Sequence, residues 1–278
     1  MFTFYIKHHF NTLRVTFGLL LTGFSLFFQS ISAQTEKFDS TACRFLNTPY
    51  VAHVLDRNST EKLEISLKEV DCTTFVEYVV AAVLSGQQPD SLNTRYRDAV
   101  QKIRYRNGRI RNYASRLHYF SEWITDNEQK KLITEITKSL NGKTMSKKID
   151  FMSTHPQSYA ALLRDTTLID SIRTVEYRLS HTPVFYIPKT EVAAIYPRLK
   201  TGDIVAITTS VKGLDISHVG FVWMKNGVAH LMHASSSAHK VIIDPLPLSE
   251  YLKNSKSATG IRVLRIRYPE YMSIFTFN

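Results

Sequence analysis

The feature of this chain that most restricts its fold is a change of character after Pro183. Before that residue the apolar positions recur mainly at helical spacing, whereas after it the chain consists of short β-rich runs separated by turn residues. Helices followed by strands, without regular alternation, are typical of an α+β fold with an antiparallel sheet. The predicted strand runs are VFYIP, GDIVAITTS, SHVGFVWM, GVAHLMHAS, KVIID and GIRVLRIRY, with a hairpin turn at Asn226-Gly227.

The helix-rich part contains one segment that is defined at both ends. It begins at Cys72, carries Phe75, Val79 and Val83 at helical spacing, and stops at Gly86. Further helical segments are predicted over residues 36–69, 91–104 (capped by Ser91), 115–124, 125–140 (ending at Asn141-Gly142), 156–163 and 168–179. No glycine-rich phosphate loop or dinucleotide fingerprint occurs in the sequence.

The N-terminal residues have the layout of an export signal. Lys7 and Arg14 precede or flank an apolar stretch, Val15–Phe28, that is shorter than the roughly 20 residues needed to span a bilayer. Ile31-Ser32-Ala33 offers a cleavage site, so we expect a signal peptide over residues 1–33 and a single exported domain over residues 34–278. The alternative is an uncleaved anchor. No second apolar run in the sequence is long enough to cross a membrane.

The charge of the chain indicates the kind of partner it suits. Removing Lys7 and Arg14 from the formal net charge of +11 leaves +9 on the expected mature chain. A basic exported protein suits an acidic partner such as cell-wall polymer or a membrane surface, whereas export argues against nucleic acid. The oligomeric state is left open.

Cys72 is the residue on which the functional interpretation depends. The chain has two cysteines, Cys43 and Cys72, and a pair in an exported protein is typical of one disulfide. A thiol in the first turn of a helix, however, lies beside unpaired N–H groups and the positive end of the helix dipole, which stabilise a thiolate. Such a cysteine is a candidate nucleophile when an imidazole lies nearby.

The strand-rich part supplies candidate imidazoles on one predicted hairpin. His218 shares a strand face with Gly220 and Val222, and the second strand carries His230 and His233, which point to opposite faces. We favour His233 as the partner of His218. Spacing alone also allows ordinary sheet histidines, or a zinc site formed by Cys72, His218 and His233.

These motifs in combination resemble those of the NlpC-type cysteine peptidases, which have a papain-like fold. The resemblance rests on DCTTF, TGDIVAI, SHVGFVW and HAS, and it extends over residues 45–268. The segments RYRNGRIRNYASRLHYFSEWITDN and GLDISHVG resemble a more specific branch, the N-acetylmuramoyl-L-alanine amidase-like enzymes of Gram-negative bacteria. This resemblance implies an N-terminal catalytic helix, an antiparallel sheet in the C-terminal half and a helical insertion at about residues 87–182.

The resemblance also implies roles for individual residues. Cys72 matches the nucleophile, His218 the general base and His233 the residue that orients the base. Asp71 matches an acid that contacts the L-alanine end of the substrate in relatives, while Thr73 stands where the broader superfamily often has serine. Cys43 falls outside the site, and the resemblance implies no disulfide with Cys72, since pairing would abolish the nucleophile. No metal or cofactor is implied.

The implied reaction is hydrolysis, through a thioester, of the amide between N-acetylmuramic acid and L-alanine in peptidoglycan fragments. The alternative is an endopeptidase that cuts between γ-D-Glu and the diamino acid. Export into a Gram-negative periplasm is implied in either case. For several insertion residues, substrate contact competes with an ordinary structural role. The tentative substrate-binding set is Asp71, Thr73, Arg106, Arg116 and Tyr119, and further candidates are Arg104, Tyr105, Tyr113 and Trp123.

Overall fold

The computed structural model describes residues 36–58 and 60–268. The predicted signal peptide, residues 1–33, lies outside the described residues. No helix in the described ranges is long and apolar enough to cross a membrane.

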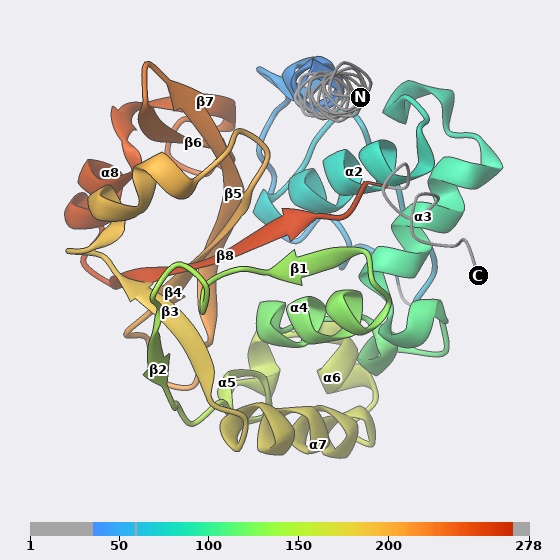
Figure 1. The fold of residues 1–278 in the computed structure, drawn as a ribbon. Coiled ribbons are helices and arrows are strands. Elements are labelled where there is room, and N and C mark those ends of the chain that lie inside the picture. Colours follow the sequence, from blue (N-terminus) through green and yellow to red (C-terminus); the bar gives the residue numbers. More distant parts are fainter. Residues whose placement is uncertain (1–35, 59, 269–278) are drawn as a thin grey trace, which may run out of the picture.

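The centre of the molecule is an antiparallel sheet with helices on both faces (Figure 1). The strand-rich sequence after Pro183 forms most of this sheet, because all six predicted strand runs lie side by side in it. The strand order is β2 (Lys143–Met145), β3 (Val184–Pro188), β8 (Ala258–Ile266), β4 (Ile204–Thr209), β5 (Ile216–Lys225), β6 (Val228–Ser235) and β7 (Lys240–Pro247), with β1 (Ile133–Glu135) also paired to β8. The prediction of an α+β fold with an antiparallel sheet is therefore confirmed.

The helices fall into three groups around the sheet. The first and second groups pack on opposite faces of the sheet. The third group covers the edge of the sheet near β1 and β2 (Figure 1). The first group is α2 (Cys72–Ser85) and α3 (Thr94–Arg104); the second is η6 (Val192–Arg198) and α8 (Leu248–Asn254); the third is α4 (Phe120–Gln129), α5 (Phe151–Thr154), α6 (Ala160–Arg164) and α7 (Leu168–Ser180). Short 3-10 turns connect them: η1 (Cys43–Phe45), η2 (Pro89–Ser91), η3 (Arg106–Gly108), η4 (Tyr113–Ser115) and η5 (Pro156–Ser158).

Helix α2 has the bounds that the sequence predicts. Its Phe75, Val79 and Val83 are fully buried, and Gly86 ends it in the left-handed conformation (φ 68°) that glycine adopts without steric cost. The alternation along β5 divides the core in two: Val219 and Phe221 pack with α2, while Val222 packs on the opposite face with α8. The strand thereby fixes the position of α2 relative to the sheet.

The prediction of one helix over residues 125–140 is wrong. Helix α4 ends at Gln129, and Lys131 takes a positive φ of 60°, which breaks the helix. Ile133, which is fully buried, then pairs with Ile266 as part of β1. Pairing with the edge of β8 therefore overrides the local helical pattern. The segment for which a helical insertion was predicted, residues 87–182, consequently contains β1 and β2 as well as helices.

Three other element predictions need correction at their boundaries. Within residues 36–69, the described residues are helical only at 36–42 and in η1. The chain after η1 instead meets the edge strand β7 through a bridge from Pro49 to Lys240. The third helix begins at Thr94, capped by the Asn93 side chain rather than by Ser91. Residues 115–124 are split between η4 and α4. In each case the sequence pattern predicts a helical element, but the element begins or ends at other residues than expected.

Candidate active site

The start of α2 is built around a reciprocal cap. Asp71 precedes the helix in an extended conformation, and its carboxylate accepts the backbone N–H of Thr74 at 2.7 Å. The Thr74 hydroxyl in turn accepts the backbone N–H of Asp71 at 2.9 Å. This cap fixes the first turn of the helix, and so it fixes the direction of the Cys72 side chain.

The Cys72 thiol lies against the strand that carries the predicted base. It is within hydrogen-bonding reach of the Val219 backbone and of Thr73, and Val219 directly follows His218. Burial, and secondly the charge of Asp71, raise the pKa of the Cys72 thiol to about 12. The resting sulfur is therefore a neutral thiol, despite its place at a helix N-terminus.

His218 and His233 form a pair on neighbouring strands. His218 Nε2 lies 2.6 Å from His233 Nδ1, and the two rings are nearly perpendicular, at 87°. Since Nε2 of His218 is used in this bond, its Nδ1 is the nitrogen left for another partner. Burial lowers the pKa of His218 to about 4 and that of His233 to about 3, so both rings rest uncharged.

Two features of the sheet allow this pair. The β4–β5 register shifts between Ile207 and Thr208, where β5 gains one residue beside His218, and such bulges re-aim side chains. Gly220 supplies the space, because a Cβ there would lie 2.7 Å from the Met232 carbonyl oxygen and 3.0 Å from His233 Cβ. The sequence indicated the space beside Gly220 but not the bulge.

The structure places the other histidine of this strand elsewhere. His230 Nδ1 donates to the Asp244 carbonyl oxygen at 3.0 Å, away from His218 on the neighbouring strand. It is therefore His233 that contacts His218, in line with the residue favoured from the sequence. His218 Nε2 and His233 Nδ1 point at one another, so these two nitrogens are not directed at a common ion, which disfavours the zinc alternative. No cluster of metal-binding side chains occurs within residues 36–58 and 60–268.

Cys43 lies in η1 and does not pair with Cys72, since both thiols are free. Burial, and secondly the charge of Asp39, raise the pKa of Cys43.

A pocket opens beside the first turn of α2. Four of the five tentative substrate-binding residues line it, and the fifth does not. The four are Asp71, Thr73, Arg116 and Tyr119, and they share the pocket with His53, Leu55, Asp56, Glu77, Tyr113, Leu117, His118, Met152, Tyr159 and Leu214. Arg106 lines a different pocket, where its guanidinium forms an ion pair with Glu122 at 2.8 Å.

The Tyr119 side chain lines the pocket, but its hydroxyl is already occupied by hydrogen bonds within the protein. The Tyr119 hydroxyl donates to Glu176 at 2.7 Å and accepts the Met152 N–H at 2.8 Å, and the ring is only 2% exposed. Tyr105 and Trp123 are more deeply buried still, so their ring faces are used in packing. The insertion aromatics are thus mainly core residues.

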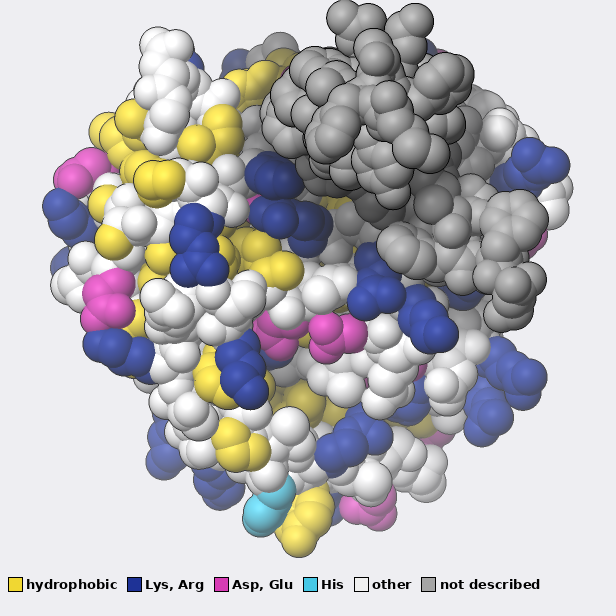
Figure 2. All heavy atoms as spheres, viewed as in Figure 1, with side chains coloured by type: hydrophobic (Ala, Val, Ile, Leu, Met, Phe, Trp, Pro, Cys, Tyr) yellow, Lys and Arg dark blue, Asp and Glu magenta, His cyan; other side chains and the backbone are white. Residues whose placement is uncertain are grey.

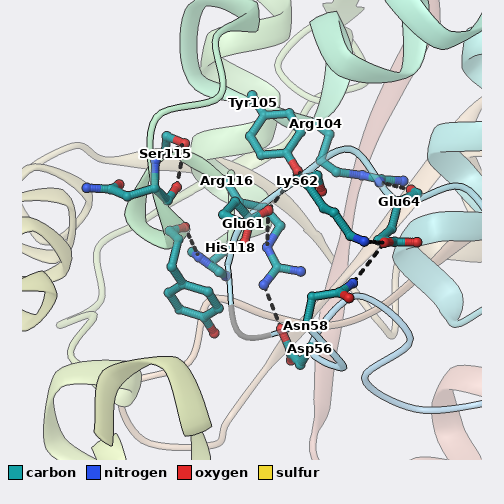
Figure 3. A network of polar contacts seen from close by, with 12 residues as sticks. Asp56, Asn58, Glu61, Lys62, Glu64, Arg104, Tyr105, Ser115, Arg116 and His118 are labelled. Atoms are coloured by element: carbon teal, nitrogen blue, oxygen red, sulfur yellow. Dashed lines mark hydrogen bonds and ion pairs between the residues drawn. The ribbon is translucent and has the colours of Figure 1, made fainter. Parts of the chain in front are cut away.

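One wall of the pocket is held by paired charges (Figure 3). Arg116 contacts Asp56 at 2.6 Å and Glu61 at 3.6 Å, and Glu61 accepts the Tyr105 hydroxyl at 2.6 Å. Arg116 therefore joins the irregular segment 46–69 to the start of the insertion. The face of the molecule seen in Figure 2 carries Lys and Arg side chains scattered among other types, not one continuous basic patch.

The sequence reasoning missed a second ion pair behind this wall. Arg104 donates to Glu77 at 2.6 Å, and both side chains are almost fully buried. Glu77 also lines the pocket. The signal available in the sequence was a glutamate in the middle of the otherwise apolar segment 75–83, since a buried carboxylate needs a partner.

The sequence reasoning also missed Asp244 and Tyr251, which surround His233. Asp244 Oδ2 lies 3.7 Å from His233 Nε2, and the Tyr251 ring packs edge-on against the imidazole at 5.3 Å. Both residues come from the segment after β6, and nothing in the local sequence marks them.

Comparison with known proteins identifies the class as amidase-like peptidoglycan hydrolases. Within that class, the chain belongs to the AmiA-like family, described as N-acetylmuramoyl-L-alanine amidase-like, which matches residues 40–261. A solved N-acetylmuramoyl-L-alanine amidase from Bacteroides uniformis is 38% identical, with a TM-score of 0.79 over 84% of this chain and 99% of that one.

Two further solved structures are similar. One from Bacteroides fragilis, provisionally named a xylanase, is 41% identical, with a TM-score of 0.77 over 82% of this chain and 100% of that one. One from Legionella pneumophila is 19% identical, with a TM-score of 0.63 over 87% of this chain and 92% of that one, and it shows the fold alone. No match was found among curated proteins.

Proposed function

We propose that the protein is an exported cysteine amidase that hydrolyses the amide between N-acetylmuramic acid and L-alanine in peptidoglycan fragments. The observation that carries this proposal is a helix-start thiol, Cys72, within hydrogen-bonding reach of the Val219 backbone, directly after His218, whose ring is hydrogen-bonded to His233. The residues on either side of Cys72, Asp71 and Thr73, line a pocket. The family and the name of the Bacteroides uniformis relative support the amide bond as the target.

The first half of the reaction forms a thioester. Cys72 Sγ attacks the carbonyl carbon of the lactyl group while His218 Nδ1 takes the thiol proton. The backbone N–H of Cys72, at the start of α2, is available to stabilise the oxyanion. His218 then gives its proton to the nitrogen of L-alanine as the C–N bond breaks, and the peptide leaves with a free amino group.

The second half releases the sugar acid. His218 takes a proton from water, which attacks the thioester carbon, and the C–S bond breaks to return the Cys72 thiol. Because burial holds the Cys72 pKa at about 12 and the His218 pKa at about 4, the resting pair is uncharged. Proton transfer is therefore coupled to attack on the substrate rather than completed beforehand.

We also propose, as finer points, that the fold belongs to the papain-like NlpC-type branch and that the protein acts in the periplasm. The first is supported by a helix-start cysteine packed on an antiparallel sheet that carries the histidines. The second rests on the predicted signal peptide.

A glycosidase is less well supported by this pocket. Glycoside hydrolysis normally uses two carboxyl groups flanking the scissile bond. The pocket carboxylates are engaged in structural bonds: Asp56 with Arg116, Asp71 with Thr74 and Glu77 with Arg104. The thiol and imidazole pair therefore gives the stronger chemical argument.

The test is to incubate purified mature protein, Cys72→Ala and Cys43→Ala with N-acetylmuramoyl-L-alanine, and separately with the free L-Ala–γ-D-Glu–diamino acid tripeptide. Products are identified by mass spectrometry. We expect L-alanine release from the first substrate, abolished in Cys72→Ala and retained in Cys43→Ala, the matched thiol control. Cleavage of the tripeptide alone would establish the endopeptidase alternative, and equal activity of Cys72→Ala would refute the cysteine mechanism.

A further inference from the structure

One polar atom beside the proposed catalytic residues has no hydrogen bond. His233 Nε2 is buried and without a hydrogen-bond partner among the described residues. A buried N–H or lone pair in this position is costly, so the group that faces it matters for its protonation. The facing group is Asp244 Oδ2, at 3.7 Å, and the Asp244 side chain is itself only 14% exposed.

The shape of β7 directs Asp244 toward this nitrogen. His230 pairs with Pro247 but Met232 pairs with Ile243, so β7 bulges over the intervening residues, which include Asp244. Asp244 Oδ1 accepts the Leu246 N–H at 2.9 Å, which fixes the carboxylate and leaves Oδ2 facing His233. The edge-on Tyr251 ring restricts the imidazole from the other direction.

The hydrogen bond between the histidines transmits the position of one proton to the other ring. For His218 Nδ1 to accept the thiol proton, His218 must carry its own hydrogen on Nε2. That N–H then donates to His233 Nδ1, 2.6 Å away, which must be an acceptor. His233 must therefore carry its hydrogen on Nε2, the atom that faces the Asp244 carboxylate.

We propose that Asp244 is a positioning residue of the active site, which holds the His233 proton on Nε2 and thereby keeps His218 Nδ1 free to accept a proton from Cys72. Asp244 touches neither the thiol nor the substrate carbonyl in this arrangement and acts through two imidazoles. The catalytic consequence rests on the proposed function, whereas the tautomer itself does not.

The sharpest test compares Asp244→Asn with Asp244→Ala. In the asparagine variant, Oδ1 keeps the Leu246 bond and the amide NH₂ takes the place of Oδ2, so an N–H rather than a negative oxygen faces His233 Nε2. This favours the His233 tautomer with its hydrogen on Nδ1, which places the hydrogen of His218 on its own Nδ1, the proposed acceptor of the thiol proton. In the alanine variant neither tautomer is imposed. The conservative substitution should therefore be the more damaging one.

The experiment measures kcat, KM and melting temperature for wild type, both Asp244 variants and Glu250→Gln. Glu250 is a matched carboxylate control, since it is half-exposed on α8 and pairs with Lys253. We expect Asp244→Asn to lower kcat roughly 10²-fold or more, with KM unchanged, by analogy with carboxylate-to-amide changes in triads. We expect a smaller loss, about 10-fold, for Asp244→Ala and none for Glu250→Gln.

A second readout does not depend on activity. Nitrogen-15 NMR of labelled histidines in the Cys72→Ala background should show His233 protonated on Nε2, and protonated on Nδ1 when Asp244→Asn is added. Equal kcat losses in the two Asp244 variants, or an Nδ1-protonated His233 with Asp244 intact, would overturn the assignment. If the wild-type protein showed no amidase activity while the tautomer change was still observed, the proposed function would fail and the tautomer assignment would stand.

Discussion

The two sides of the candidate site are both buried, but they handle burial in opposite ways. Around Cys72, His218 and His233, burial moves each pKa toward the uncharged form. Behind the pocket wall, in contrast, the buried Arg104 keeps its charge. Burial alone would lower the pKa of Arg104, but the adjacent Glu77 carboxylate raises it above its usual range. The difference is the presence of an opposite charge within hydrogen-bonding distance.

This contrast explains how one pocket can be both rigid and reactive. The wall groups are fixed by ion pairs whose loss would leave a buried charge, so they suit a structural role. The thiol and imidazoles have no such permanent partner and can gain and lose a proton during a reaction. Substitutions of the thiol and imidazoles should therefore lower activity, whereas substitutions of the ion-paired groups should lower the stability of the fold.

The largest effect is expected on the reactive side. His218→Ala should lower kcat by roughly 10²–10⁴-fold, because the proposed proton acceptor is removed. The melting temperature should fall less than in a variant that breaks a buried ion pair, because His218 is half-buried and its ring bonds to His233 but forms no ion pair among the described residues. Steady-state kinetics and calorimetry measure the two quantities. His181→Gln, an exposed histidine in α7's C-cap, is the control and should keep full activity.

The next effect is expected in the wall. Arg104→Met should destabilise the fold by about 3–5 kcal/mol, because it leaves Glu77 buried and unpaired. Urea unfolding measures the change. The double variant Arg104→Met with Glu77→Leu should recover most of this loss, because neither charge then remains. If the double variant were as unstable as the single one, packing rather than charge would account for the role of Arg104.

The smallest effect is expected on stability at low pH. His118, which lines the pocket, has its pKa lowered from 6.5 to about 3, first by burial and then by Arg116. Between these values the unfolded chain binds a proton that the folded chain does not, so this residue costs stability as pH falls below 6.5. His118→Gln should therefore flatten the decline of melting temperature between pH 6.5 and 4.

The acid measurement has a matched control. His239 is exposed and has a positive φ of 55°, which asparagine tolerates, so His239→Asn should leave the slope unchanged. An identical decline in wild type and His118→Gln would mean that His118 takes up its proton without opposing the fold.

The sequence predicts the reactive side of this site better than the wall, for a physical reason. Helix α2 and the β5–β6 hairpin are regular elements, so their periodicity and turn residues predict both their bounds and the faces of their side chains. The place of Cys72 and the presence of both histidines on neighbouring strands follow from that regularity, whereas the bulge beside His218 does not. The roles of these residues in catalysis remain predictions until the proposed activity is measured.

The ion pairs of the pocket wall and the contact between Asp244 and His233 could not be predicted from local periodicity. Arg116 meets Asp56 across 60 positions of chain, and Asp244 faces His233 because of a bulge that leaves no local signal. β1 fails for a related reason, since its partner β8 lies more than a hundred residues further along. Long-range pairing decides these elements, and periodicity within a short window contains no information about it.

The position of β8 has a consequence for biosynthesis. This strand, Ala258–Ile266, lies between β3 and β4 in the middle of the sheet, although it is made after every other described strand. Until it emerges, β3 and β4 present unpaired edges, which are prone to join strands of other chains. The sheet therefore cannot close until synthesis is almost finished, and a chain terminated before Ala258 would leave β3 and β4 without their shared neighbour.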